Sequence, residues 1–333
     1  MAVKIYYTLK SFMYQQLYRK YSKKKIDFLC SICNKVNSIY IHEVVFMTIK
    51  IRKSYILASA FFIFFSCAFV YFLPIISKAE EQEGIKVPII MYHQVTKKSS
   101  RRGKYSVMYE EFENDMKYIK EKGYTTIDMT DLINFVYGKK ELPEKPIMIT
   151  LDDGFESVYA YVYPLLKELD MCAVASIVGE YTTFFTENPD HNITYSYLNW
   201  NEVEELTKTD VIEIQNHSYN LHKNSGNRRG ISKKHDEDVA AYNTEVGADI
   251  LKMQNVMKEK TGYTPNTLTF PFGAYKKETI SLAKSLGFKA ALLCEERVNI
   301  IKQGDTEKLY HLGRYNRPSS VSTESFFDKI LED

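Results

Sequence analysis

The sequence predicts an α/β protein, in the form of a distorted parallel (β/α) barrel preceded by one N-terminal transmembrane helix. Two observations predict this fold class. Between about residues 87 and 293, short apolar runs alternate with segments of helical periodicity, the pattern of a parallel sheet covered by helices. Before them, the 22 residues 55–76 contain no charge, which is long enough to cross a bilayer core of about 30 Å.

Residues 1–54 are a basic segment. Residues 1–53 contain eleven Lys or Arg against Asp27 and Glu43. We interpret this segment as partly non-native, because a chain beginning at Met47 would place a short basic stretch directly before the apolar run. The remainder of the chain is net acidic, which argues against a main domain that binds nucleic acid.

The apolar run 55–76 predicts a transmembrane helix or signal anchor. Three basic residues precede it and three Glu residues follow it, so the positive-inside rule puts residue 77 onward outside the cytoplasm. We therefore expect a single-pass protein of the cell membrane with an extracellular catalytic domain. The small residues around Ser77-Lys78-Ala79 also suit a signal peptidase, so a secreted form and, less favourably, a buried core helix stay open.

Residues 77–86 read as an acidic linker, and residues 87–333 as the catalytic unit. Helices are expected where apolar residues recur at helical spacing, and Gly123, Gly262 and Gly287 predict the ends of three of them. The expected strands are 87–91, 146–151, 173–178, 211–214, 268–270 and 289–293. The expected helices are one with Phe112, Met116 and Ile119 on one face, and those at 158–169, 203–206, 239–260 and 279–286.

Two carboxylates follow the second of these strands. Asp152 and Asp153 come directly after the apolar run 146–151, and Gly154 allows a tight turn. In β/α barrels the chemistry lies at the carboxyl ends of the strands. An Asp-Asp-Gly sequence taken alone is more often a plain turn.

Two histidines follow another strand. His217 and His222 lie just after the run 211–214. Two imidazoles and one carboxylate make three ligands that leave a position open for water, the arrangement of a hydrolytic zinc site. A third strand leads into Phe270-Pro271-Phe272-Gly273, which alone would be an ordinary strand exit.

Together these segments resemble a known family. The order MYH at 91–93, LDDG at 151–154, HSYNLH at 217–222 and FPFG at 270–273 is similar to the polysaccharide deacetylase family with the NodB-homology domain, carbohydrate esterase family four. The resemblance covers about 145–333 for the homology domain and begins near 87 for the catalytic unit.

The resemblance implies a role for each matching residue. Asp153, His217 and His222 would bind a divalent metal, usually zinc in this family. Asp152 would be the general base for the attacking water, and the backbone N–H of Phe272 would be an oxyanion donor. Acetate and a free amine on the sugar would be the products.

The chain departs from the family pattern at three places. Four residues instead of three separate His217 from His222, so the ligand loop is expected to bulge. Thr269 stands where the family commonly has an Arg that orients the base, and Arg314 is our hypothetical substitute, since an Arg can hold a carboxylate with two hydrogen bonds. Leu309-Tyr310-His311 fits the family's last motif, which makes His311 the candidate general acid, with a solvent-facing histidine as the alternative.

The MYH opening, the missing Arg and the LGRYNRP ending are more similar to the subgroup that acts on β-1,6-linked poly-N-acetylglucosamine. The implied substrate is an extracellular polymer that contains N-acetylglucosamine, with peptidoglycan and chitin-like polymers also open. Two alternatives remain: a non-catalytic glycan-binding module on the same fold, and an O-acetyl polysaccharide (xylan) esterase. An aromatic-rich stretch suits stacking on sugar rings or ordinary packing: Tyr181, Phe184, Phe185, Tyr195, Tyr197 and Trp200.

Overall fold

The structure is a computed structural model that describes residues 23–24, 27–28, 31, 84–225 and 227–331. The predicted transmembrane helix at 55–76 and most of the linker lie outside these residues. Among the helices that are described, none has the length and apolar character needed to span a bilayer. Residues 82–333 form one compact unit, and all that follows concerns this unit.

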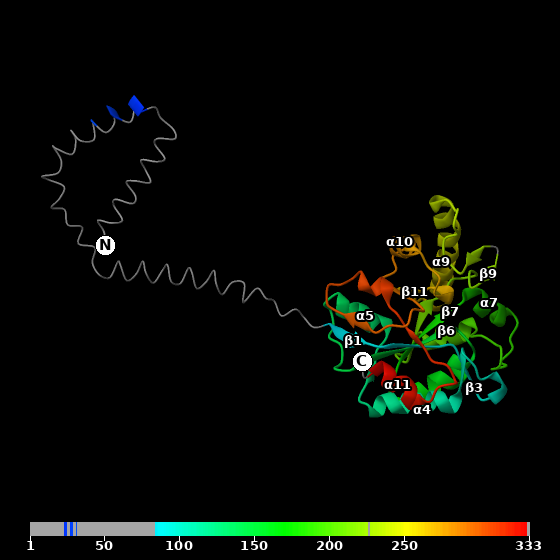
Figure 1. The fold of residues 1–333 in the computed structure, drawn as a ribbon. Helices are drawn as coiled ribbons and strands as arrows, with labels where there is room; N and C mark the ends of the chain where they lie inside the picture. Colours follow the sequence, from blue (N-terminus) through cyan, green and yellow to red (C-terminus); the bar gives the residue numbers. More distant parts are fainter. Residues whose placement is uncertain (1–22, 25–26, 29–30, 32–83, 226, 332–333) are drawn as a thin grey trace. The chain divides into compact units, whose positions relative to one another are not determined.

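A curled parallel sheet forms its centre (Figure 1). The strand order is β12-β11-β8-β7-β6-β2-β14, with β5 also paired to β6, and every one of these pairings is parallel. The strands are β2 (Ile89–Tyr92), β5 (Thr125–Thr126), β6 (Pro146–Asp153), β7 (Ala173–Ile177), β8 (Ile212–Asn216), β11 (Thr267–Thr269), β12 (Ala290–Leu292) and β14 (Tyr315–Asn316).

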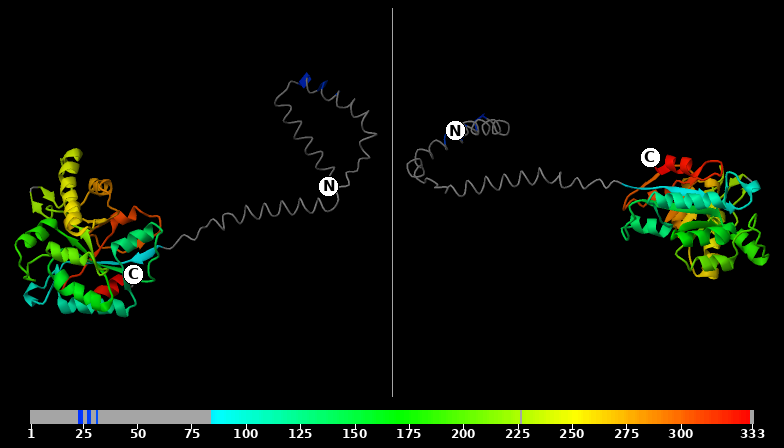
Figure 2. Two further views of the ribbon diagram at one scale, coloured as in Figure 1. Left: turned by 180° about the vertical axis from the view of Figure 1, so that it is seen from behind. Right: turned by 90° about the horizontal axis from the view of Figure 1, so that it is seen from below.

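Helices surround the outside of the sheet, as the two turned views show (Figure 2). In Figure 1, α4 and α11 lie side by side at one edge of the unit and α9 lies with α10 at the opposite edge. The helices are α4 (Tyr109–Glu121), α5 (Met129–Val136), α6 (Tyr163–Leu169), α7 (Gly179–Glu187), α8 (Trp200–Leu206), α9 (Val239–Thr261), α10 (Lys277–Ser285) and α11 (Thr323–Leu331).

Three small strand pairs flank the main sheet. They are antiparallel β1 (Ile85–Val87) with β13 (Asn299–Ile301), parallel β3 (Gln94–Thr96) with β4 (Ser106–Met108), and antiparallel β9 (Asn224–Ser225) with β10 (Arg228–Arg229). The predicted strand at 87–91 is therefore wrong in one respect, because it is divided between β1 and β2. Pro88 stands at the break, since proline has no N–H to give to a ladder.

One chain segment brings the two edges of the curled sheet together. Leu312 forms a parallel bridge with Leu292 of β12, and Tyr315 of β14 pairs with Ile90 of β2. The barrel is thus closed by an irregular segment instead of a full strand, which is the distortion in the predicted barrel. Arg314 lies within this closing segment.

The two-residue period of β6 sets up the site. Ile147, Ile149 and Leu151 pack into one apolar cluster, whereas Met148 packs into another, because successive side chains point to opposite faces of a strand. Asp152 continues the face of Met148 and Thr150. All three side chains are buried, so the strand delivers a carboxylate into the interior at its carboxyl end.

The remaining predicted elements are mostly confirmed. Gly262 ends α9 in a left-handed conformation, as the sequence predicted. The predicted helix at 158–169 is a π-helical turn over Val158–Val162 followed by α6. Helices α5, α7 and α11 were not predicted.

Candidate active site

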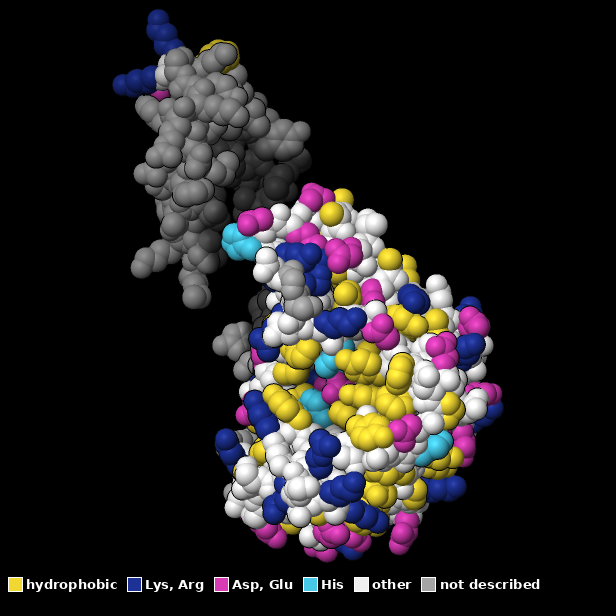
Figure 3. Space-filling view, turned by 90° about the vertical axis from the view of Figure 1, so that its right-hand side faces the viewer, with side chains coloured by type: hydrophobic (Ala, Val, Ile, Leu, Met, Phe, Trp, Pro, Cys, Tyr) yellow, Lys and Arg dark blue, Asp and Glu magenta, His cyan; other side chains and the backbone are white. Residues whose placement is uncertain are grey.

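A cavity of about 730 Å³ lies at the carboxyl ends of the central strands. Figure 3 shows it as a hollow with histidine and acidic atoms at its floor, apolar side chains around them and Lys or Arg side chains farther out, mainly on the left of the view. Five of the predicted site residues line it: Asp152, Asp153, His217, His222 and Phe272. Segments far apart in the sequence therefore meet at one place.

A left-handed turn at the end of β6 presents Asp153. Asp153 has φ 73° and Gly154 has φ 78°, so two consecutive residues occupy a region that costs most L-residues about 1–2 kcal/mol. Glycine is required at 154, because a Cβ there would lie 2.9 Å from the Ile177 side chain. Ser218 and Phe272, also at strand ends in this site, are left-handed as well. Such strain concentrates at functional sites.

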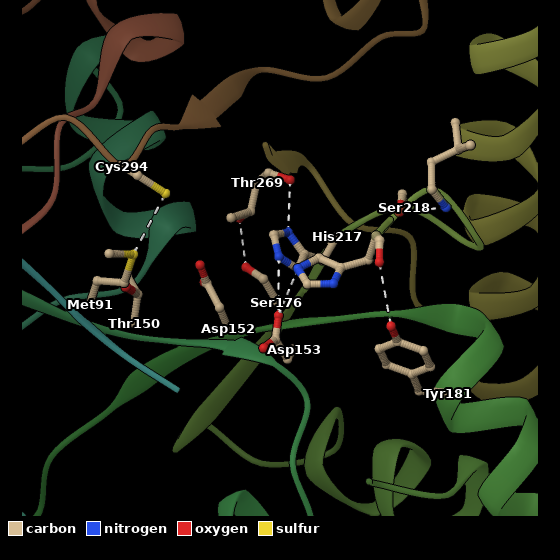
Figure 4. A network of polar contacts seen from close by, with 12 residues as sticks. Met91, Thr150, Asp152, Asp153, Ser176, Tyr181, His217, Ser218, Thr269 and Cys294 are labelled. Carbon is tan, nitrogen blue, oxygen red and sulfur yellow. Dashed lines mark hydrogen bonds and ion pairs between the residues drawn. The ribbon is translucent and has the colours of Figure 1, made fainter. Parts of the chain in front are cut away.

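The carboxylate of Asp153 meets two imidazoles (Figure 4). Its Oδ1 lies 3.5 Å from His217 Nε2 and 3.1 Å from His222 Nε2, and the three ligand atoms lie within 4.8 Å of one another. His217 Nδ1 is 2.9 Å from the carbonyl oxygen of Thr269. A hydrogen bond donated there fixes the tautomer that leaves Nε2 free to bind a metal.

Two of the three candidate ligands, Asp153 and His222, have the charge states that a metal needs. Asp153 Oδ1 is buried and has no hydrogen-bond partner among the described residues. Burial would raise the pKa of Asp153, but His217, His93 and His222 outweigh it and hold the pKa below its ordinary value. Burial, followed by the neighbouring His217, lowers the pKa of His222 to about 4. An ionised carboxylate and a neutral imidazole are the forms that coordinate metals, so these residues fit a divalent cation.

The predicted bulge between the two histidines is present and is clamped from α9. Ser218 has φ 73°, and its Oγ accepts a hydrogen bond of 3.2 Å from the N–H of Leu221. The next two backbone N–H groups, of Tyr219 and Asn220, donate to the two carboxylate oxygens of Asp249, each at 2.9 Å. Sequence reasoning missed Asp249, because a single acid within a helix has no pattern that marks it.

Arg314 forms a two-pronged ion pair with Asp152. Its guanidinium donates to Oδ1 at 2.7 Å and to Oδ2 at 2.8 Å, and its Nε donates to the carbonyl of Leu293 at 2.8 Å. Burial would raise the pKa of Asp152, but Arg314 outweighs it and holds this pKa well below its usual range. Asp152 is therefore ionised, with its two oxygens fixed in one plane.

Thr269 stands where the resemblance predicts an Arg, and its hydroxyl pairs with that of Ser176. Thr269 Oγ1 lies 2.6 Å from Ser176 Oγ in the buried interior. The charge that would pair with Asp152 thus comes from the closing segment instead of from β11. Gly313 allows the closing segment to lie close to the backbone of Glu295, since a Cβ at position 313 would lie 2.6 Å from the carbonyl oxygen of Glu295.

Besides His217 and His222, the imidazole that lines the cavity is His93 and not His311. His311 does not line the cavity, and its backbone carbonyl accepts a hydrogen bond from Arg297. The physical reason is direction: the closing segment runs parallel to the strands, so His311, which precedes Leu312, lies toward their amino ends. His93 follows β2 and lines the cavity, and its Nδ1 is buried without a hydrogen-bond partner among the described residues. Burial lowers the pKa of His93, and Asp152 and Asp153 oppose this shift.

Aromatic rings form a cluster, the aromatic wall, beside the candidate metal ligands. Phe155, which lines the cavity, stacks on Tyr197 with ring centroids 4.6 Å apart, and Tyr181 lies 4.6 Å from the same ring. Phe184 is 55% exposed. Trp200 instead is buried and donates from its Nε1 to Thr183, so it is a packing residue.

A second group of metal-competent side chains lies near the first. Glu156, His191 and Glu202 offer ligand atoms within 4.8 Å of one another. His191 Nδ1 is 2.8 Å from Glu156 Oε1, but its side chain is 62% exposed. Glu202 also caps α8 by accepting the N–H of Asn199. These contacts explain the group as the anchor of the loop that precedes α8.

Comparison with known proteins shows which family part of the chain resembles. The model of the polysaccharide deacetylase family matches residues 139–291. A poly-β-1,6-N-acetyl-D-glucosamine N-deacetylase of Escherichia coli (strain K12) is 24% identical over 217 residues, which are 60% of this chain and 32% of that protein. The protein of the same description from Staphylococcus aureus (strain MSSA476) is 26% identical over 195 residues, which are 58% of this chain and 62% of that one. The match thus spans only part of each relative.

A solved structure gives the same fold. The de-N-acetylase from Aggregatibacter actinomycetemcomitans superposes with a TM-score of 0.63 at 21% identity and covers 74% of this chain and 100% of that one. This likeness supports a NodB-type α/β fold for the described unit. The family model over residues 139–291 shows that this part of the chain is a polysaccharide deacetylase domain.

Proposed function

We propose that this protein is a metal-dependent polysaccharide deacetylase that hydrolyses N-acetyl groups of an extracellular polymer containing N-acetylglucosamine. One observation carries the proposal: the carboxylate of Asp152, held by Arg314, lies beside the Asp153, His217 and His222 cluster at the floor of one cavity. The names of the two relatives favour poly-β-1,6-N-acetylglucosamine as the polymer.

Asp153, His217 and His222 are the proposed ligands, and zinc is the proposed ion, because two imidazoles and one carboxylate with an open position suit it. When bound, such an ion supplies a Lewis acid that polarises the acetamide carbonyl and lowers the pKa of a water. Thr269 holds His217 in the tautomer that leaves its Nε2 free.

Asp152 is the proposed general base and accepts the proton of the attacking water. Arg314 keeps it ionised and orients its oxygens. The nitrogen of the leaving amine must also be protonated, which calls for a general acid. We propose His93 in place of His311 as the imidazole that delivers a proton to this nitrogen, since its ring faces the cavity and its Nδ1 is unpaired.

Phe272 and the aromatic wall complete the proposed site. The left-handed φ of 60° at Phe272 belongs to a turn that lines the cavity, and its N–H is the proposed donor to the developing oxyanion. Phe155, which lines the cavity and stacks on Tyr197, offers a ring on which a sugar can stack. We also propose that residues 55–76 anchor the protein in the cell membrane, with the catalytic unit 87–333 outside.

The deciding experiment is acetate release by the full chain from β-1,6-linked N-acetylglucosamine oligomers, with zinc and with a chelator. We expect release that needs the metal and is abolished in Asp152→Asn. Asp236→Asn is the matched control, because this side chain is 92% exposed and lies outside the site. Release of acetate only from O-acetylated xylan would instead favour an esterase. Binding of glycan without any release would favour a non-catalytic module.

A further inference from the structure

One part of the cavity wall carries three cations that have no carboxylate partner among the described residues. Arg101, Lys104 and Arg229 line the cavity, and within the described residues none of them forms an ion pair with an Asp or Glu. They come from two separate segments, the loop before β4 and strand β10. Figure 3 shows Lys and Arg side chains gathered on this side of the hollow.

Each segment contains two adjacent arginines, of which one forms an ion pair and the other lines the cavity. In the loop, Arg102 pairs with Glu111 at 2.5 Å, while Arg101 lines the cavity. In β10, Arg228 is held by Glu237 and Glu245, while Arg229 lines the cavity. The paired arginine anchors its segment in both cases. The unpaired neighbour keeps its charge available to whatever enters the cavity.

Arg229 lies closest to the proposed chemistry. Its guanidinium is 5.8 Å from the ring centroid of Phe272 and donates at 3.4 Å to the Phe272 carbonyl. The Phe272 ring in turn stacks on His222 at 4.5 Å. Of the carboxylates that line the same cavity, Asp152 is already paired with Arg314 and Asp153 belongs to the ligand cluster, which leaves Glu296. The wall therefore presents net positive charge to a substrate.

We propose that Arg101, Lys104 and Arg229 make the site select against polymer stretches that already carry a free amine. The inference rests on the proposed deacetylase function. Hydrolysis breaks the amide C–N bond and leaves acetate and an amine, which takes up a proton near neutral pH. An N-acetylated unit is neutral, whereas its product is a cation that the wall repels from the cavity. Successive acetates are then removed at spaced positions along the polymer.

The expected difference in rate between neutral and amine-bearing polymers follows from Coulomb's law. In a wet cavity, each charge at a separation of roughly 10 Å changes the rate about twofold, so three cations opposed by the one carboxylate of Glu296 give about fourfold at low salt. Salt screens such exposed charges, with a Debye length of about 10 Å at 0.1 M. The selectivity should therefore shrink as salt rises, unlike a preference caused by shape.

The test compares three β-1,6-linked pentamers with the zinc-loaded full chain. One pentamer is fully N-acetylated, one has a free amine on its central unit, and one has glucose there, which lacks the acetamide but is neutral. The readout is acetate release per remaining N-acetyl group under kcat/KM conditions at low and high salt. The glucose pentamer separates the effect of charge from the loss of a contact.

We expect the amine pentamer to react about fourfold more slowly than the glucose pentamer at low salt. The difference should narrow at high salt and in the double variant Arg101→Gln, Lys104→Gln. The double variant Lys98→Gln, Lys258→Gln is the matched control, since it loses two exposed lysines that do not line the cavity.

Two results would overturn the inference alone: equal rates for the amine and glucose pentamers, or a difference that neither salt nor the cavity variant alters. Acetate release in either case would leave the deacetylase function standing. Absence of acetate from all three pentamers would overturn the proposed function and the inference together. The salt series uses the unmodified protein, so it decides the matter even where a variant folds poorly.

Discussion

Arg314 and Asp152 form a buried ion pair in which each residue depends on the other. Removing one partner of such a pair costs about 3–5 kcal/mol of stability, because the other charge stays buried alone. The protein contains a second buried pair, Arg317 with Asp115, joined by hydrogen bonds of 2.8 and 3.0 Å. The second pair contacts neither the candidate metal ligands nor Asp152. A comparison of variants in the two pairs can therefore distinguish an effect on stability from an effect on catalysis.

We expect Arg314→Lys to lose most acetate release while keeping the fold. A lysine keeps the positive charge but offers one ammonium instead of a planar fork, so Asp152 would lose its fixed orientation. Arg317→Lys is the control: it should destabilise the protein to a similar extent in urea but lower kcat far less at a temperature where both variants are folded. Equal kcat losses in the two variants would contradict a positioning role for Arg314.

The two candidate imidazoles give a second contrast at the scale of single residues. His93→Gln should lower kcat by about 10²–10⁴-fold, the usual contribution of a general acid or base, with zinc still bound in full. His311→Gln should leave kcat nearly unchanged, because His311 does not line the cavity. Acetate assays beside zinc analysis of each variant check this, and the reverse ranking would restore His311 as the acid.

At the scale of elements, the ligand loop 217–222 depends on helix α9. Asp249 accepts two consecutive backbone N–H groups of the bulge, and this contact places His222 opposite Asp153. Residues that orient metal ligands typically contribute 10–100-fold to metal affinity. The element that carries the ligands is thus positioned by another one about thirty residues later in the sequence.

We expect Asp249→Ala to weaken zinc binding by roughly 10–100-fold, because the bulge would lose both acceptors. Competition with a chromophoric chelator measures the affinity without reference to activity. Glu259→Ala is the matched control on the same helix, since Glu259 makes only an exposed ion pair with Lys260. Unchanged affinity in Asp249→Ala would show that the bulge holds its shape without the clamp.

At the scale of the whole molecule, stability should depend on pH through a carboxyl far from the site. Burial, followed by Asp128, raises the pKa of Glu213 from 4.5 to about 7. Glu213 lies on β8 and accepts the N–H of Met129 at 2.8 Å, as well as a hydrogen bond from Thr130, so it joins the sheet to α5. The folded protein therefore keeps a proton on Glu213 that the unfolded chain releases.

The sign of the effect follows from this difference in protons. Between pH 4.5 and about 7 the folded state binds more protons, so the free energy of unfolding falls as pH rises. The fall attributable to Glu213 is roughly 3 kcal/mol at most. Urea unfolding across this range should show a smaller fall in Glu213→Gln than in the unmodified protein. The unmodified protein and the variant must be compared directly, because the pKa of Glu202 is also raised to about 7 and adds its own pH dependence. An equal fall of the free energy of unfolding with pH in both proteins would contradict the role of Glu213.

Much of the fold was predictable because local rules and tertiary structure agree. The run 146–151 became β6, and its period placed Asp152 in the interior. Helix α7 was missed because its sequence, GEYTTFFTE, has no clear helical period. The irregular closing segment was missed because it has almost no regular secondary structure of its own, and only its pairing with both sheet edges reveals what it does.

The sequence by itself determined the order of the main strands and of the helices between them that have a clear period, the carboxylate pair at the end of one strand and the histidine pair at the end of another. These follow from hydrophobic periodicity and from turn chemistry, which act over a few residues. Only the tertiary structure decided that Arg314 supports Asp152, that His93 and not His311 enters the cavity, and that Asp249 clamps the ligand loop. Those contacts join residues from about 30 to more than 160 positions apart, and such pairings depend on how the sheet curls and closes.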